Sequence, residues 1–154
     1  MDSSEKRILF QSKGFPEFRF LSNFHVCRIE DEFGQTYHSV EQAYQCAKAN
    51  TEEDWYLVKD CATPAEARRA GSKVKLSENW SEQKDHHMEK YVRYKFFQNK
   101  DLAELLLATE DFELVEYAPW GDTYWGVDKE LKGENRLGKI LMKVRGELKE
   151  REGK

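Results

Sequence analysis

The sequence predicts a single domain that is built mainly of helices, with a few short strands. Three observations support this prediction. At 154 residues the chain has the usual length of one domain and can bury a substantial core. Several segments combine the helical spacing of apolar residues with residues that cap helices. The stretches that resemble strands are short, and no internal repeat or low-complexity linker divides the chain.

Composition and charge narrow the function. The net charge of −4 argues against a broad surface that coats nucleic acid, although it leaves room for a small basic pocket. No apolar run approaches the roughly 18 residues of a membrane-spanning helix. Residues 1–6 lack the apolar segment of a secretory signal. We therefore expect a soluble, cytoplasmic protein that contacts no membrane.

The cysteines and histidines do not form a metal-binding pattern. The three cysteines lack the close pairing of metal ligands, and the four histidines do not complete a zinc motif with them. We expect reduced thiols, as is usual in the cytoplasm, and neither a structural metal nor a cofactor. The residues concerned are Cys27, Cys46, Cys61, His25, His38, His86 and His87.

The N-terminal region begins with a strand pattern at Arg7–Gln11, which Gly14–Pro16 interrupts. Phe18–Phe24 follows as an apolar stretch that holds Arg19 between two phenylalanines. Two interpretations stay open for Arg19. It points outward from an alternating strand, or its aromatic neighbours hold the guanidinium for a phosphate.

A small antiparallel β element is predicted next. His25–Ile29 continues as a strand, Asp31–Gln35 has the residues of a hairpin turn, and Thr36–Tyr37 forms the returning strand. The hairpin therefore leads directly into the helix that begins after it.

The segment from 39 to 48 is predicted to be a helix with a polar edge. Ser39 is a good N-cap, and Gln42 completes a capping box of the form Ser-x-x-Gln. Glu41, Gln45 and Lys48 share one edge beside the apolar face. This edge is either a solvated surface with a Glu–Lys pair or a functional edge that presents a carboxylate, an amide and an ammonium. The apolar face consists of Val40, Ala43, Tyr44 and Ala47.

Further helices are predicted at 53–61, 63–71, 80–99 and 101–109, and a short strand at Leu114 and Val115. The helix at 63–71 has clear boundary signals, with Thr63 as N-cap, Pro64 in its first turn and Gly71 at its end. Trp80 begins the long helix, and two interpretations stay open for its ring: core packing, or the wall of a pocket.

Residues 118–134 show no convincing period and are predicted to form a long loop. Such loops are uncommon inside compact domains and are often functional. Trp120 and Trp125 lie in this loop beside acids and glycines. Each either covers the edge of the core or stacks on a flat ring.

The last helix is predicted to begin at Asn135. Asn135 can cap it, and Gly138 can allow another backbone or a ligand to approach closely. Because Arg136 and Lys139 are basic, this helix start is either an ordinary capped end or a site that holds an anion with its free N–H groups. The predicted buried stripe consists of Leu137, Ile140, Leu141, Val144 and Leu148.

A set of motifs in a fixed order resembles one known family. No single motif is decisive, but their order and spacing together resemble the NADAR, or YbiA-like, family. The motifs are Phe20-Leu21-Ser22-Asn23-Phe24, Ser39-Val40-Glu41-Gln42-Ala43-Tyr44-Gln45, Lys48-Ala49, Gly71, Trp80, Met88, Lys95-Phe96, Leu114-Val115-Glu116, Tyr124-Trp125-Gly126, Gly133, Asn135 and Leu137-Gly138.

The resemblance implies a compact α+β single domain, mainly α, that spans residues 1–154 with a core of about 8–149. It also implies an N-glycosidase that hydrolyses a ribosyl C1′–N bond. Some members act on phosphoribosylamino-pyrimidine intermediates of riboflavin synthesis. Others resemble enzymes that remove ADP-ribose from guanine in nucleic acid. The implied partner is a small phosphoribosyl or ADP-ribosyl substrate or, for the second group, ADP-ribosylated nucleic acid.

The resemblance also implies the site residues. The family's active site is centred on the acid that matches Glu41, with the Trp-Gly segment at Trp125 and Gly126 and a nearby aspartate. Here that acid is Asp128, two residues after the glycine, whereas other members often place it immediately after. Asp122 is the alternative. We expect Glu41 and the Trp-Gly segment to converge on one concave pocket.

Cleavage of a ribosyl C1′–N bond passes through an oxocarbenium-like centre, so the site needs a carboxylate, a donor for the leaving nitrogen, and anchors for phosphate and base. We expect Glu41 to be the catalytic carboxylate, acting as nucleophile or as general base, with Asp128 as a second acid. Trp125 stacks on the base, and Lys48 contacts substrate or phosphate. Further binding candidates are Arg19, Asn23, Trp80, Gly126, Asn135 and Lys139.

Two other functions stay open. A non-catalytic module would bind ADP-ribose or a related nicotinamide-adenine-dinucleotide derivative in the same pocket. A nucleic-acid-directed ADP-ribosyl hydrolase would need a basic approach surface. Two basic segments are candidates for that surface, although each also fits an ordinary solvated face: Arg68, Arg69, Lys73 and Lys75, and Lys139, Lys143 and Arg145.

Overall fold

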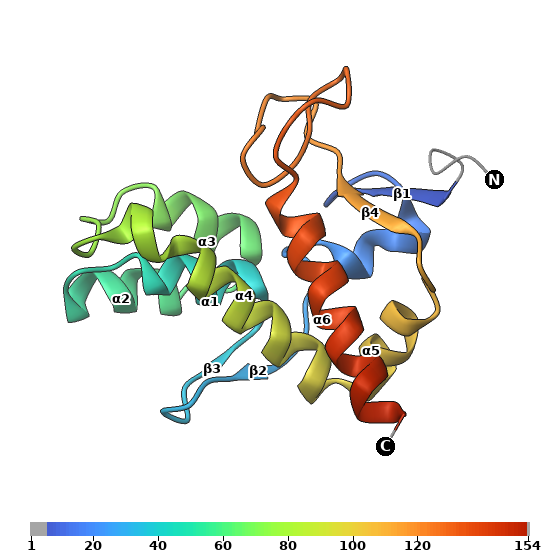
Figure 1. The fold of residues 1–154 in the computed structure, drawn as a ribbon. Coiled ribbons are helices and arrows are strands. Elements are labelled where there is room, and N and C mark those ends of the chain that lie inside the picture. Colours follow the sequence, from blue (N-terminus) through green and yellow to red (C-terminus); the bar gives the residue numbers. More distant parts are fainter. Residues whose placement is uncertain (1–5, 154) are drawn as a thin grey trace. The chain divides into compact units, whose positions relative to one another are not determined.

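The computed structural model describes residues 6–153 and consists mostly of helices with a few short strands (Figure 1). The chain divides into two compact units. We call residues 23–99 the central unit, and the described residues up to 22 and from 100 onward the terminal unit. The predicted mainly helical α+β class is confirmed.

Helix α1 (Val40–Ala47) is the helix around which the central unit is built. It packs against α2 (Glu52–Lys59), α3 (Pro64–Gly71) and α4 (Trp80–Gln98), as Figure 1 shows. Every residue from Val40 to Cys46 is buried. A helix that is buried on all sides must satisfy its polar side chains internally, and this requirement shapes the site described below.

The predicted caps of the central helices are confirmed. The hydroxyls of Ser39 and Thr63 accept bonds from the backbone N–H three residues later, at 3.1 and 3.2 Å. The capping box at Ser39 differs from the prediction. Gln42 Oε1 accepts from the N–H of His38, at 2.9 Å, and not from that of Ser39. The glutamine amide reaches one residue beyond the cap because its other end is held elsewhere in the unit.

The antiparallel element is confirmed but is shorter than predicted. Strand β2 (Ile29–Glu30) pairs with β3 (Thr36–Tyr37), and Asp31 Oδ1 accepts from the N–H groups of Phe33 and Gln35 within the turn. Residues 25–28 do not form a strand, so the prediction of a strand over His25–Ile29 was wrong for its first four residues.

The terminal unit contains a parallel pair of strands, β1 (Arg7–Phe10) and β4 (Glu113–Glu116), in register from Arg7 opposite Glu113 to Phe10 opposite Glu116. A 3₁₀ helix, η2 (Pro16–Leu21), follows β1 in this unit. The strand interpretation of this apolar stretch was wrong. Pro16 fixes a helical φ at the first turn, and the three-residue turn then buries Phe20 and Leu21 while Arg19 stays exposed.

Helices α5 (Lys100–Leu107) and α6 (Arg136–Glu152) complete the terminal unit and pack against each other, and α6 also covers β4. The predicted buried stripe of α6 is confirmed at every position. The close approach expected at Gly138 is also confirmed, because an added Cβ would overlap Leu114 O. Residues 118–134 form the predicted long loop without regular helix or strand.

Among residues 6–153, no helix is both long and apolar enough to cross a membrane.

Candidate functional site

The polar edge of α1 is buried. Glu41 is 8% exposed and Gln45 is 5% exposed, so the interpretation of this edge as a solvated surface was wrong. The backbone holds Glu41 in place, since its N–H donates to Asn23 O at 3.1 Å in the first turn of the helix. An acid near a helix N-terminus is favoured by the helix dipole, which partly offsets the cost of burial.

Glu41 and Gln45 form a direct pair. Gln45 Nε2 donates to Glu41 Oε2 at 2.6 Å, which is the length of a strong charge-assisted bond. The other end of the same amide, Gln45 Oε1, is buried and has no hydrogen-bond partner among residues 6–153. The i, i+4 spacing on a helix brings the two side chains together, and the donated bond favours the ionised carboxylate.

Lys48 lies one turn beyond this pair and is half-buried. Burial lowers the pKa of the Lys48 ammonium, the positive charges of Arg68 and Lys84 lower it further, and Glu41 opposes the shift. Its Nζ lies 5.5 Å from the ring centroid of Tyr44. Arg68 and Lys84 therefore act electrostatically on Lys48 beside a carboxylate, and such a group of cations favours a bound anion such as phosphate.

Trp80 packs inside the central unit. It is 7% exposed, its ring stacks on His87 at 5.5 Å, and Tyr44 lies 5.3 Å away between ring centroids. Core packing, one of its two open interpretations, is therefore confirmed. Its use as a pocket wall stays a prediction. Asn23 donates from Nδ2 to Met88 Sδ at 3.4 Å, so its side chain also faces the interior of the unit.

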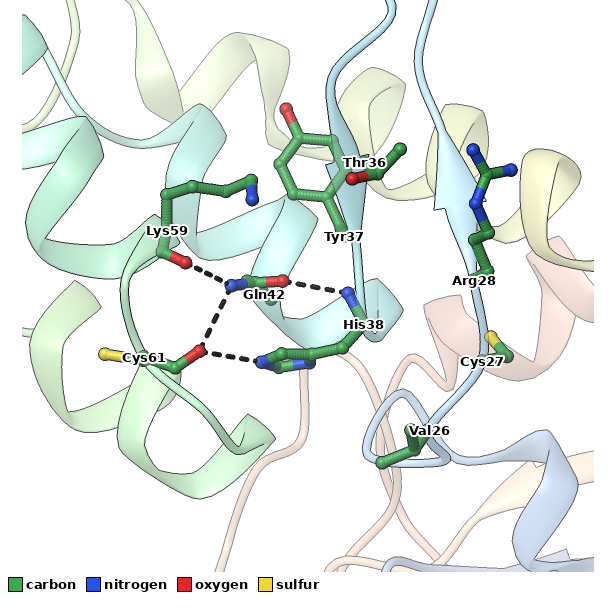
Figure 2. Close-up of a pocket in the computed structure, with 9 residues that line it drawn as sticks. All are labelled: Val26, Cys27, Arg28, Thr36, Tyr37, His38, Gln42, Lys59 and Cys61. Atoms are coloured by element: carbon green, nitrogen blue, oxygen red, sulfur yellow. Dashed lines mark hydrogen bonds between the residues drawn. The ribbon is translucent and has the colours of Figure 1, made fainter.

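A separate cavity of about 480 Å³ lies beside Gln42 (Figure 2). Gln42, His38 and two backbone carbonyls form one hydrogen-bond network there. Gln42 Nε2 donates to the carbonyls of Lys59 and Cys61, at 2.9 and 3.3 Å, and His38 Nε2 lies 3.1 Å from Cys61 O. Because the polar atoms of this network already have hydrogen-bond partners within it, we interpret the network as structural support for α1.

In the terminal unit, Asp122 organises the Trp-Gly segment. Its Oδ1 accepts from the N–H groups of Tyr124 and Trp125, at 3.2 and 3.0 Å. The rings of Tyr124 and Trp125 meet edge to face at 4.9 Å, and Trp125 is half-buried. Gly126 follows where only a glycine fits, since an added Cβ would lie 2.5 Å from Glu116 O.

Asp128 closes a turn in the same loop. Its Oδ1 accepts from the N–H groups of Glu130 and Lys132, at 2.9 and 3.0 Å. Both candidate second acids thus bind backbone N–H groups through one oxygen. Asp122 holds the tryptophan segment itself, and Asp128 shapes the turn after it. The choice between them as a second acid stays a prediction.

The start of α6 differs from the predicted side-chain cap. Asn135 makes no cap bond; its Oδ1 accepts from Glu116 N and its Nδ2 donates to Leu114 O, so the amide ties the helix to β4. The N–H groups of Arg136 and Leu137 donate to loop carbonyls and are not free for an anion. The prediction of an anion site built on these N–H groups was wrong for both positions, because the loop satisfies them.

The remaining basic candidates are mostly exposed. Arg19 donates to Lys13 O from the surface, and Lys139 is exposed on α6. Arg145 does not belong to a basic surface, since it is 6% exposed and donates to Thr109 Oγ1 at 2.8 Å. Its place in a nucleic-acid-binding segment is therefore wrong. Arg68 and Arg69 are exposed on α3.

Several predicted residues gather within each unit. Glu41, Asn23, Lys48 and Trp80 belong to the central unit and are linked by contacts through Tyr44 and the Asn23 carbonyl. The Trp-Gly segment and Asn135 belong to the terminal unit. The expected convergence of Glu41 with Trp125 concerns both units and stays a prediction. Sequence analysis placed Gln45 on the polar edge of α1 without a separate role, and it assigned no site role to Gly71 or Tyr44.

Helical spacing was the available signal for Gln45, because it lies four residues after Glu41. Nothing in the sequence indicates which helix contacts Gly71. In residues 6–153, no group of three or more histidine, cysteine, aspartate or glutamate side chains could hold a metal ion.

Comparison with known proteins places these features in a family. The family model described as the NADAR domain matches residues 9–149. N-glycosidase YbiA of Escherichia coli is 36% identical over 129 residues, which cover 82% of this chain and 79% of that protein. An N-glycosidase of Nostoc punctiforme is 38% identical over 135 residues, covering 83% and 84%.

Two further comparisons extend the match. A riboflavin biosynthesis protein of Vibrio vulnificus is 37% identical over 133 residues, which cover 85% of this chain but 36% of that protein. The NMR structure of E. coli YbiA aligns with a TM-score of 0.85 and 34% identity, covering 96% of this chain and 87% of that one. The chain belongs to the NADAR domain family.

Proposed function

We propose that this chain hydrolyses a ribosyl C1′–N bond in a phosphorylated ribosylamine substrate, with Glu41 as the catalytic carboxylate. By its family and its relatives named N-glycosidases, the chain is a hydrolase that acts on N-glycosyl bonds. The observation that carries the residue assignment is the buried Glu41–Gln45 pair beside Lys48. A buried, oriented carboxylate next to cations suits a reaction that develops positive charge on a sugar and needs a phosphate anchor.

The preferred substrate class is a phosphoribosylamino-pyrimidine of the riboflavin pathway. Relatives from Vibrio vulnificus and Zea mays are named riboflavin biosynthesis proteins, at 37% and 30% identity. ADP-ribosylated guanine is the second substrate class, because it presents the same ribosyl C1′–N bond.

In the proposed mechanism, Glu41 either deprotonates the attacking water or attacks and stabilises C1′ directly. Lys48 holds the phosphate, so that binding energy from a remote group lowers the barrier at the sugar. Trp125 stacks on the base, and Asp128 contacts the ribose hydroxyls, with Asp122 as the alternative. Further proposed substrate contacts are Arg19, Asn23, Trp80, Gly126, Asn135 and Lys139.

A panel of ribosyl-N substrates tests the proposal, with products identified by mass spectrometry. The panel contains a phosphoribosylamino-pyrimidine, its dephosphorylated form, free ADP-ribose and an oligonucleotide with ADP-ribosylated guanine. We expect release of the free pyrimidine and ribose 5-phosphate from the first compound and much slower release from the second. Release from the oligonucleotide alone would move the assignment to the second substrate class.

The alternative of a binding module gives a different result in the same experiment. A module that only holds ADP-ribose would show ligand-induced thermal stabilisation without any product. That outcome would refute the hydrolytic proposal.

A further inference from the structure

Gln45 and Gly71 lie in contact with each other next to Glu41. The amide of Gln45 contacts the Glu41 carboxylate through Nε2 and Gly71 through its opposite side. A Cβ placed on Gly71 would overlap Gln45 Oε1 and would lie 2.6 Å from Gln45 Cδ. Helix α3 therefore confines the amide from the side that faces away from the carboxylate.

Gly71 is needed for space and not for backbone conformation. The described glycines with positive φ are Gly34, Gly121 and Gly133, and Gly71 is not among them. Gly71 is buried as the last residue of α3. Alanine has a higher helix propensity than glycine and would ordinarily be the more stable residue in a helix. The absent side chain leaves room for one group, the Gln45 amide.

The orientation of the amide is fixed by chemistry. With Oε1 and Nε2 exchanged, an amide oxygen would face an oxygen of the ionised carboxylate and no donor would remain between them. In the observed orientation the carboxylate gains a donor, and Oε1 is left buried against Gly71 without a partner. A fold ordinarily satisfies such an acceptor, because leaving it unpaired costs free energy. Here that cost accompanies a firmly held carboxylate.

We propose that Gln45 is a positioning residue for the catalytic carboxylate and that Gly71 holds Gln45 in register. The proposal rests on the proposed function of Glu41. Gln45 fixes one carboxylate oxygen, stabilises the ionised form of the carboxylate and so sets its orientation relative to water or to C1′ of the ribosyl group. Gly71 acts through Gln45 and touches neither substrate nor the reacting atoms.

The test uses the full chain with three variants and a matched control. Gly71→Ala pushes the Gln45 amide out of place, Gln45→Ala removes the amide, and the double variant combines them. In the double variant the Cβ of residue 45 remains 2.9 Å from the added Cβ, so the clash with the amide is removed but the two helices must still shift slightly. Gly146→Ala is the control, because an added Cβ there meets nothing within 4 Å.

On the phosphoribosylamino-pyrimidine, we expect Gln45→Ala and Gly71→Ala each to lower kcat by about tenfold and to leave KM within about twofold. The acidic limb of the pH–kcat profile should move to higher pH in both variants, since the donor to the ionised carboxylate is lost or displaced. The double variant should be no slower than Gln45→Ala, because Gly71 acts through the amide. Gly146→Ala should match the wild type.

Wild-type kcat and an unchanged pH profile in a folded Gln45→Ala protein would overturn the inference, while loss of activity in Glu41→Gln would leave the proposed function standing. If Gly71→Ala does not fold, Gln45→Ala carries the test, since it only removes atoms.

If the wild type hydrolyses no member of the panel, the proposed function fails separately. The pair is then tested by ¹³C NMR of the Glu41 side-chain carboxyl in the free protein. Its titration should move to higher pH in Gln45→Ala and not in Gly146→Ala. An unmoved titration would refute the positioning role.

Discussion

Two glutamines on α1, three residues apart, show how differently a fold can use the same buried side chain. Gln42 is 2% exposed and bonds to backbone at both ends of its amide, through the N–H of His38 and the carbonyls of Lys59 and Cys61. Gln45 is 5% exposed, bonds to a carboxylate at one end and has no partner at the other.

The different hydrogen-bond partners of Gln42 and Gln45 indicate that one buried glutamine supports the fold and the other supports the site. A side chain that satisfies backbone groups stabilises the fold, and its loss leaves those groups unpaired. A side chain that is only partly satisfied and holds an acid contributes little net stability, yet it can orient a reacting group. We therefore expect the region of Gln42 to govern unfolding and the region of Gln45 to govern turnover.

The largest expected effect on stability is at Gln42. Gln42→Leu should lower the free energy of unfolding by about 3 kcal/mol, because three partly buried backbone groups each lose a hydrogen bond worth roughly 0.5–1.5 kcal/mol. Gln45→Leu should change it by less than about 1 kcal/mol, since loss of the bond to Glu41 is offset by removal of the orphaned oxygen. Urea denaturation of both variants measures the contrast. Equal losses of unfolding free energy in the two variants would contradict the contrast between Gln42 and Gln45.

The local features of this fold were predictable, and the long-range ones were not. Ser39 and Thr63 act as caps because a cap depends on residues within one turn. The parallel pairing of β1 with β4 was missed, since it joins Arg7 to Glu113 across most of the chain. The 3₁₀ helix was missed because the Phe-Arg-Phe pattern around Arg19 also fits strand alternation.

The same distinction applies to the candidate site. Helical spacing placed Glu41, Gln45 and Lys48 on one edge, and the resemblance to a family singled out the acid. Burial of that edge could not be predicted, because it depends on helices that pack around α1. Gly71 was read as a helix end, and its contact with Gln45 exists only after α3 packs on α1. The Asn135 amide likewise left its predicted cap for a bond to β4.

A buried lysine in α4 should affect the stability of the fold in a pH-dependent way. Lys95 is 1% exposed, and burial lowers its pKa to about 8. Below pH 8 folded and unfolded chains both hold the proton; above it the unfolded chain binds more protons, so this group makes stability rise with pH. The contribution should reach about 2 kcal/mol by pH 9.5. Unfolding of wild type and Lys95→Met, measured from pH 7 to 9.5, isolates it, and a constant difference between them would contradict it.

Lys48 provides a test of the proposed phosphate contact. Lys48→Ala should raise KM for the phosphoribosylamino-pyrimidine about tenfold, roughly 1.4 kcal/mol, while kcat changes little. Because burial and neighbouring cations lower the pKa of the Lys48 ammonium, wild-type KM should rise at alkaline pH, below the usual lysine range. Lys143→Ala, at an exposed position on α6, is the control. Equal KM values for the phosphorylated and dephosphorylated substrates would exclude a phosphate contact at Lys48.

The most direct test of the account is the turnover of Glu41→Gln on the phosphoribosylamino-pyrimidine, with released base quantified and thermal unfolding recorded on the same preparation. We predict a folded protein whose melting temperature matches or exceeds that of the wild type and whose turnover falls by at least ~10²-fold, the low end for a positioned acid–base group. Near-normal turnover by the folded variant would contradict the account.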